Sequence, residues 1–144
     1  LDNKLTVTGL KIKMYAGYIF SSLMWNEVLK SEIKNLSVHF APELNDEKHN
    51  KLAEIAQTEL PTDDAGCRAL ITSLQHQLSL KEKEAAAILL TIAASHSPSQ
   101  VNDAVIELVL KYMEPAGIVE IVVWLSVLQL LNRLSSYYSL VKEN

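Results

Sequence analysis

Glycine and proline are scarce in this sequence, and that scarcity limits the folds it can adopt more than any other feature. Only four glycines and four prolines occur among 144 residues. A fold of many short strands needs turn residues at close intervals, whereas long helices do not. Hydrophobic residues make up 49% of the chain, enough for one core in a domain of this length. We therefore predict a single all-α domain over residues 1–144, an array of five to seven helices.

The first predicted helix runs from about Leu10 to Phe40. Its apolar residues recur at intervals of three to five, as they do on one face of a helix. Gly17 and the pair Ser21–Ser22 are the places where we expect this long helix to kink or divide.

Two helices are predicted in the middle of the chain. The first begins after Asn45, a suitable N-cap that is followed by two acids, and Pro61 stops it. Thr62 is expected to cap the next one. That helix carries one apolar face, at spacings of three and four, made of Cys67, Leu70, Ile71 and Leu74.

Two later helix starts fit the capping box, in which a Ser is followed three residues on by Glu or Gln. They are SLKE at 79–82 and SPSQ at 97–100, the second with Pro98 at the first helical position. Between them, AAAILLTIAA at 85–94 is apolar nearly all round, which predicts a central helix.

The last predicted helix starts at Pro115 and contains IVEIVVWLSVLQLL at 118–131, in which eleven of fourteen residues are apolar. A membrane span needs about 20 predominantly apolar residues. This run is shorter and contains Glu120 and Gln129. We predict that it forms much of the core and a subunit contact, and that the chain does not cross a membrane.

Glu120 is unusual because apolar residues surround it. Such an acid either lies on an exposed stripe or is paired internally, and Arg133 is a candidate partner from another helix or subunit. Trp25 and Trp124 are expected to be packing anchors.

Charge and cysteine content exclude several classes of function. The net charge is −4 and no run of Lys or Arg occurs, so the chain lacks the basic surface of a nucleic-acid-binding protein. A single cysteine excludes an intrachain disulfide framework and a cysteine-rich zinc site. We expect a cytoplasmic protein with no metal and no cofactor.

Cys67 and the four histidines are the residues with the most chemical potential. A lone cysteine on an apolar stripe is most often a small buried residue, with a reactive thiol as the alternative. No two histidines lie three or four residues apart, the spacing of a helical metal site. For His96, beside Ser95 and Ser97, we expect local hydrogen bonding.

A succession of elements from residue 80 onward is typical of a known family. It consists of an acidic helix start, a small-residue apolar helix, a proline, an amphipathic helix and a long helix with an early Glu and a final Asn-Arg-Leu. In this sequence they are residues 82–84, 85–94, Pro98, 101–113, Glu120 and 132–134. The arrangement resembles the alkylhydroperoxidase (AhpD)-like, carboxymuconolactone-decarboxylase-like family. It covers residues 80–134 best, reaches back to about Leu44, leaves residues 1–43 outside, and implies an all-helical oligomer.

Redox-active members of that family use a Cys-x-x-Cys pair, a His four residues after the second Cys, and a Glu on the preceding helix. The resemblance places Cys67 at the second cysteine, with Asp64 at the first and Ile71 at the histidine. Glu54 is the nearest match to the glutamate. In such a site one thiol becomes a sulfenic acid and the second condenses with it, so this chain lacks the internal resolving step.

We therefore expect an AhpD-like structural, binding or regulatory module that forms a homo-oligomer. Two enzymatic alternatives stay open. One is a single-cysteine hydroperoxide reductase, an antioxidant peroxidase with Cys67 as nucleophile and Glu54 as proton carrier. The other is a cofactor-free decarboxylase-like enzyme that acts on a small organic acid. A further alternative is an unrelated helical adaptor. The expected partner is a protein or a small-molecule peroxide, and neither nucleic acid nor membrane.

Overall fold

The computed structural model describes residues 9–96 and 101–143, without the side chains at 136 and 138–143. These ranges form seven α-helices and no strand, which confirms the all-α prediction. In chain order the helices are α1 (Leu10–Leu23), α2 (Glu27–Phe40), α3 (Asp46–Ala56), α4 (Asp64–Leu78), α5 (Glu82–Ser95), α6 (Asp103–Tyr112) and α7 (Pro115–Glu143).

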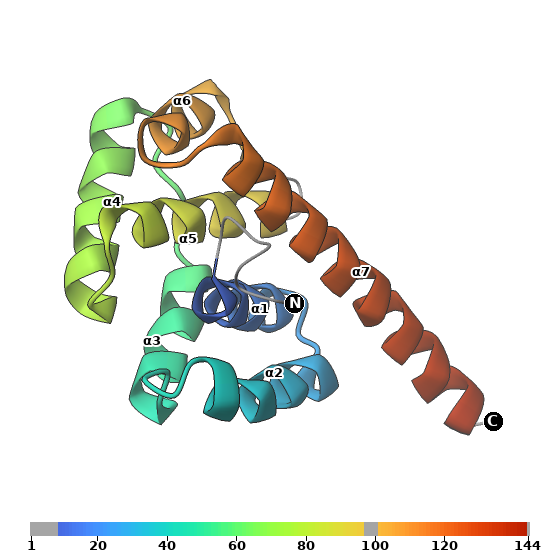
Figure 1. Ribbon diagram of the computed structural model, residues 1–144. Coiled ribbons are helices and arrows are strands. Elements are labelled where there is room, and N and C mark those ends of the chain that lie inside the picture. The colour runs from blue at the N-terminus through green and yellow to red at the C-terminus, as the bar shows by residue number, and fades with distance from the viewer. Residues whose placement is uncertain (1–8, 97–100, 144) are drawn as a thin grey trace.

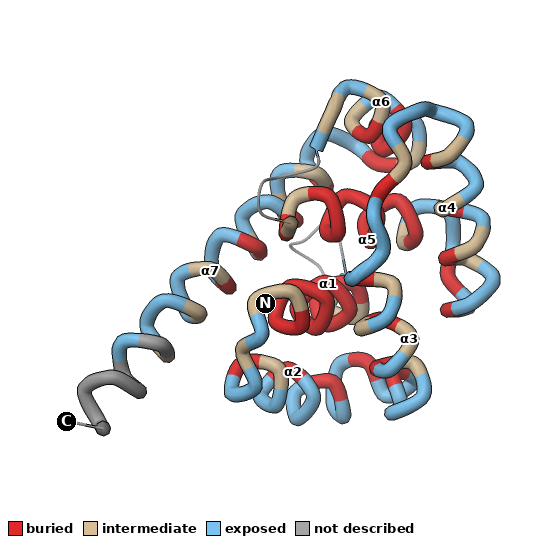
Figure 2. Tube along the Cα trace, turned by 180° about the vertical axis from the view of Figure 1, so that it is seen from behind, coloured by how far each residue is buried: buried red, intermediate tan, exposed pale blue. Residues whose placement is uncertain are grey.

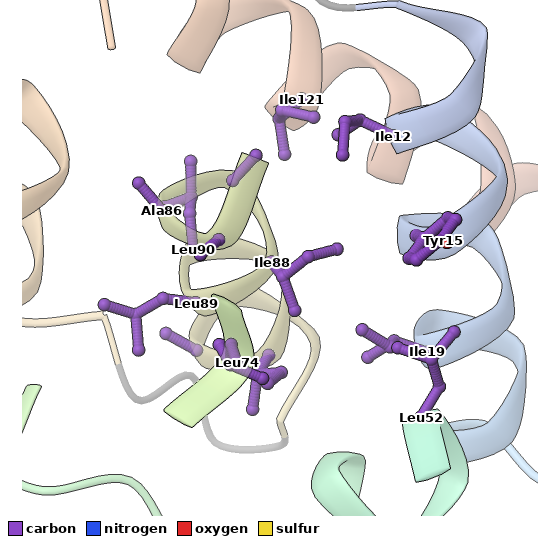
Figure 3. Packing of buried hydrophobic residues seen from close by; sticks show 14 of the residues in the cluster. Ile12, Tyr15, Ile19, Leu52, Leu74, Ala86, Ile88, Leu89, Leu90 and Ile121 are labelled. Carbon is purple, nitrogen blue, oxygen red and sulfur yellow. The ribbon is translucent and has the colours of Figure 1, made fainter. Parts of the chain in front are cut away.

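Helices α1 and α5 form the centre of the molecule (Figure 1). Helix α1 packs against α2, α3, α5 and α7, and α5 packs against α1, α4, α6 and α7. Every residue of α5 from Ala85 to Ala93 is buried, as the apolar sequence of this stretch predicts. Figure 3 shows Ile88 of α5 pointing toward Tyr15 and Ile19 of α1, all three of which are fully buried.

The predicted helix 10–40 is divided into α1 and α2. The break follows Leu23, just beyond the Ser21–Ser22 pair at which a kink or division was predicted. Trp25 adopts a left-handed conformation with φ of 53° in the turn. Asn26 then caps α2, because its side chain accepts a hydrogen bond from the backbone N–H of Leu29 at 2.9 Å. Trp25 is 78% exposed, so the prediction that it anchors packing is wrong.

Gly17 does not bend α1, which is continuous through it. It allows α1 and α2 to lie close together instead. A Cβ atom at this position would lie 3.0 Å from Cδ1 of Ile33 on α2. The absent side chain is thus a packing feature and not a hinge.

Two of the predicted helix starts and one predicted helix end can be compared with the structure at α3 and α4. Asn45 caps α3 as predicted, with its side chain accepting from the N–H of Lys48. Asp63, not Thr62, caps α4. Helix α3 ends at Ala56, five residues before the proline that was expected to stop it.

The predicted capping box at 79–82 is also wrong. Ser79 ends α4 in a left-handed conformation with φ of 55°. Helix α5 begins at Glu82, and the carboxylate of Glu84 accepts from the N–H of Lys81 at 3.0 Å. The box at 97–100 lies outside the described residues, and α6 begins at Asp103.

Helix α7 starts at Pro115 as predicted, but it does not form much of the core. It lies along one side of the other helices and its C-terminal part extends beyond them (Figure 1). Its described residues bury only four positions, which we call the inner stripe: Gly117, Ile121, Leu125 and Leu128. Core burial therefore accounts for only a few of the apolar residues of α7.

Candidate functional site

Cys67 lies in the first turn of α4 and is completely buried. The turn is tight, because the side chain of Asp63 accepts from the N–H of Gly66 at 3.0 Å. A Cβ atom on Gly66 would come within 2.5 Å of Pro61, so only glycine fits here. The thiol points back at the same segment and lies 3.5 Å from the carbonyl oxygen of Pro61, to which it can donate.

The surroundings of Cys67 disfavour a thiolate. Burial raises the pKa of its thiol, and the negative charges of Asp63 and Asp64 raise that pKa further. The thiolate is the form that attacks peroxides. Both effects favour the protonated thiol over the thiolate, and the side chain is buried.

The other residues that the family resemblance implies do not gather around this sulfur. Asp64 is exposed and forms an ion pair with Arg68 at 2.6 Å. Ile71 is a buried core residue. Glu54 is exposed on α3, and no hydrogen bond or ion pair joins it to Cys67 in the described part of the chain. The catalytic roles of Cys67 and Glu54 thus remain predictions without a geometric site behind them.

We expect the native thiol of Cys67 to react with a disulfide reagent such as DTNB at least about 100-fold more slowly than it does in denaturant, because reaction requires the helix start to open. Stopped-flow absorbance in native buffer and in guanidinium chloride measures both rates. Hydrogen peroxide consumption should be the same for the wild type and for Cys67→Ser. Rapid native labelling, or peroxide turnover lost in Cys67→Ser, would contradict this account.

His49 is a buried titratable residue whose place in the core the sequence analysis did not predict. It is buried on α3, and neither ring nitrogen has a hydrogen-bond partner in the described residues. Its ring stacks at a tilt on that of Tyr18, with 4.4 Å between centroids. Leu52 follows His49 by three residues, and Ala56 follows Leu52 by four. This spacing places His49 on the apolar face of α3 and could have predicted its burial. Both nitrogens are closed to solvent, so no ligand reaches them in this arrangement.

Burial lowers the pKa of His49 below its usual value of 6.5, and the nearby Lys34 cation lowers it further. The unfolded chain therefore takes up a proton at a higher pH than the folded chain does. We expect the free energy of unfolding to fall as the pH drops below about 6.5. The part of this pH dependence that comes from His49 should vanish in His49→Phe, a variant that keeps an aromatic ring against Tyr18. Urea titrations at several pH values test this, with Asn50→Ala as the control. An unchanged pH slope in His49→Phe would contradict it.

The remaining histidines form no site. His39 and His76 are exposed. The Nε2 atom of His96 and the hydroxyl of Ser95 are buried with no partner among the described residues, so the expected local hydrogen bonding is not seen there. In the part of the chain that the structure describes, no three His, Cys, Asp or Glu residues gather in a way that could hold a metal ion.

The most prominent surface feature is the solvent side of α7 (Figure 2). Six large apolar or aromatic residues follow one line along the helix, roughly half a turn away from the inner stripe. We call this line the outer stripe: Val119, Val123, Val127, Leu130, Leu134 and Tyr137, each between 43% and 67% exposed. Val122 and Leu131 flank it and are similarly exposed. Exposed apolar surfaces of this extent are found at protein–protein or membrane contacts in other proteins.

Polar contacts hold α7 against the other helices in addition to the inner stripe. Lys13 of α1 is almost fully buried and lies 3.6 Å from the carboxylate of Glu120. Glu120 is thus paired internally, as one of the two alternatives predicted, but with Lys13 rather than Arg133. Trp124 donates its indole N–H to the backbone carbonyl of Lys13 at 2.8 Å, so this tryptophan does anchor the packing.

A second polar contact lies farther along α7. The side-chain amide of Asn26, in the turn between α1 and α2, donates to Asn132 at 2.8 Å and to Ser135 at 2.9 Å. These contacts fix which face of α7 points inward. The outer stripe therefore faces solvent because the opposite face is specifically bound.

By length and composition alone, the segment Pro115–Ser135 could also cross a membrane. Its most apolar 18-residue window has a mean hydropathy of 1.6, and only 22% of that window is buried against the other helices. The core helix of a soluble protein is mostly buried, and α7 is not. Burial in its own domain therefore does not account for the apolar residues of the outer stripe.

Comparison of the chain with protein-family profiles, with curated proteins and with solved structures finds no match. The AhpD-like resemblance over residues 80–134 therefore stays a prediction from the sequence.

Proposed function

We propose that this protein is a non-catalytic helical interaction module whose binding surface is the outer stripe of α7. The observation that carries the proposal is the exposure of six aligned apolar side chains on a helix whose other face is already bound to its own domain. The proposal includes descent from the AhpD-like family that the sequence resembles. In this chain the dithiol chemistry of that family would have been lost.

The geometry around Cys67 supports the non-catalytic part. A peroxidase of this kind needs an accessible thiolate and a second thiol one helical turn away. Here the single thiol is buried, its pKa is raised, and Asp64 occupies the position one turn earlier. No observation favours the decarboxylase-like alternative over the interaction module.

Site-specific photocrosslinking tests the proposal in the cells that make the protein. A benzophenone amino acid at Leu131, beside the outer stripe, should give a discrete crosslinked species on a denaturing gel. The same group at Val38, an exposed apolar residue on α2, is the matched control and should give none. Equal crosslinking from both positions, or none from Leu131, would contradict an interaction surface on α7.

A further inference from the structure

We infer that the outer stripe of α7 binds a second copy of this chain, so that two α7 helices pair about a two-fold axis. This inference rests on the proposed function, because it names the partner of the same surface. A two-fold contact uses one patch twice, and so the patch must complement itself.

The spacing of the outer stripe is that of a helix-pairing seam. From Val123 the successive intervals to Val127, Leu130, Leu134 and Tyr137 are four, three, four and three residues. This is the a/d pattern of a coiled coil, in which each side chain inserts between four residues of the facing helix. The spacing lines the side chains up in one continuous face, against which a second helix can pack.

The stripe is also long and wide enough for a stable contact. From Val119 to Tyr137 it extends about 27 Å along the helix axis. A typical stable interface takes roughly 800 Å² from each partner, so a pairing of this kind has to use the whole length of the stripe and to reach Val122 and Leu131 at its two flanks.

The charge on this face fits another copy better than an anionic partner. Among the exposed and described side chains of α7 between Val119 and Tyr137, Arg133 is the one that carries a charge, at the edge of the stripe. The chain as a whole has a net charge of −4, which opposes binding to anionic lipid or nucleic acid. A second copy carries the same net charge, but its outer stripe is uncharged, so no like charges meet at the contact itself.

The contacts of the inner stripe argue against α7 leaving the domain to span a bilayer. Insertion would separate Glu120 from Lys13, and it would carry a carboxylate into hydrocarbon. It would also break the contacts of Trp124 and Asn26 with the opposite elements. Pairing of the outer stripe leaves all of these contacts in place.

Sedimentation equilibrium of purified protein tests the inference. The wild type should sediment at twice the chain mass of 16.1 kDa. Leu130→Asp, at the middle of the stripe, should sediment at the single-chain mass with an unchanged helical circular dichroism spectrum. Leu110→Asp, at an exposed leucine on α6, is the matched control and should remain a dimer.

A wild type that sediments as a single chain, or a Leu130→Asp variant that stays dimeric, would overturn the inference. In a flotation assay with vesicles of zwitterionic phosphatidylcholine, the wild type should stay in the bottom fraction, apart from the vesicles. Wild-type protein that rises with the vesicles would overturn the second-copy inference in favour of a lipid surface. If the purified wild type is a single chain while Leu131 still crosslinks in cells, the second-copy inference fails and the interaction module stands. If Leu131 does not crosslink either, both fail.

Discussion

Replacement of Ile88 by Ala should lower the free energy of unfolding by about 3–4 kcal/mol, because it leaves a cavity where the central helices meet. Ile88 is fully buried at the middle of α5 and faces Tyr15 and Ile19 of α1 (Figure 3). The α1 backbone on that side is held by α2 and α3 as well, so the gap cannot close easily. Urea unfolding followed by circular dichroism measures the loss.

Leu110→Ala is the control for that prediction. Leu110 is exposed on α6, and its truncation should change the free energy of unfolding by less than about 0.5 kcal/mol. A loss below about 1 kcal/mol for Ile88→Ala would show that α5 is not the tightly packed centre of the fold.

The second large effect concerns the charged pair that holds α7. Glu120→Gln should lower the free energy of unfolding by about 3 kcal/mol, because it removes the carboxylate that faces the almost fully buried Lys13. The neutral amide is nearly the same size, so the loss reports the charge and not the packing. Chemical denaturation near neutral pH measures it.

Two further variants complete this test. Glu107→Gln, at an exposed acid on α6, should leave the stability within about 0.5 kcal/mol of the wild type. Replacement of both partners by apolar residues, Lys13→Met with Glu120→Leu, should recover most of the loss, because no buried charge is then left without its counterpart. A double variant less stable than Glu120→Gln alone would indicate that the pair itself stabilises α7.

Much of the fold follows from local sequence signals. The scarcity of turn residues predicts helices, the apolar run at 85–94 predicts the central α5, and Asn45 and Pro115 predict two helix starts that the structure confirms. Asn26 followed by an acid carried the same kind of signal for α2, but the continuous apolar spacing of residues 10–40 outweighed it. Local caps therefore deserve more weight than periodicity at such places.

The placement of α7 could not be derived in this way. Helices α5 and α7 are both apolar on nearly all sides, yet α5 is buried and α7 presents one apolar face to its own domain and the other to solvent. Composition gives the amount of apolar surface, but not which neighbours cover it. The partner of Glu120 was equally hidden, since Lys13 lies more than one hundred residues away in the sequence.

The candidate site shows the same division between local and long-range information. The position of Cys67 on the buried face of α4 follows from its spacing to Ile71 and Leu74, and the structure confirms it. The pKa of its thiol depends on the fold, because burial raises that pKa first and the charges of Asp63 and Asp64 raise it further. Whether Cys67 or Glu54 acts in any reaction remains a prediction.

The most direct test of the α7 contact is an intermolecular relaxation measurement. A nitroxide label at Arg133→Cys in a Cys67→Ala background lies at the edge of the outer stripe. This protein is mixed with unlabelled chains enriched in ¹⁵N. We predict that the nitroxide broadens backbone amide signals of α7 in the enriched chains, around Val123 to Leu134, and leaves those of α4, on the far side of the molecule (Figure 1), sharp. Broadening that is absent, or that is centred on any helix other than α7, would contradict the account.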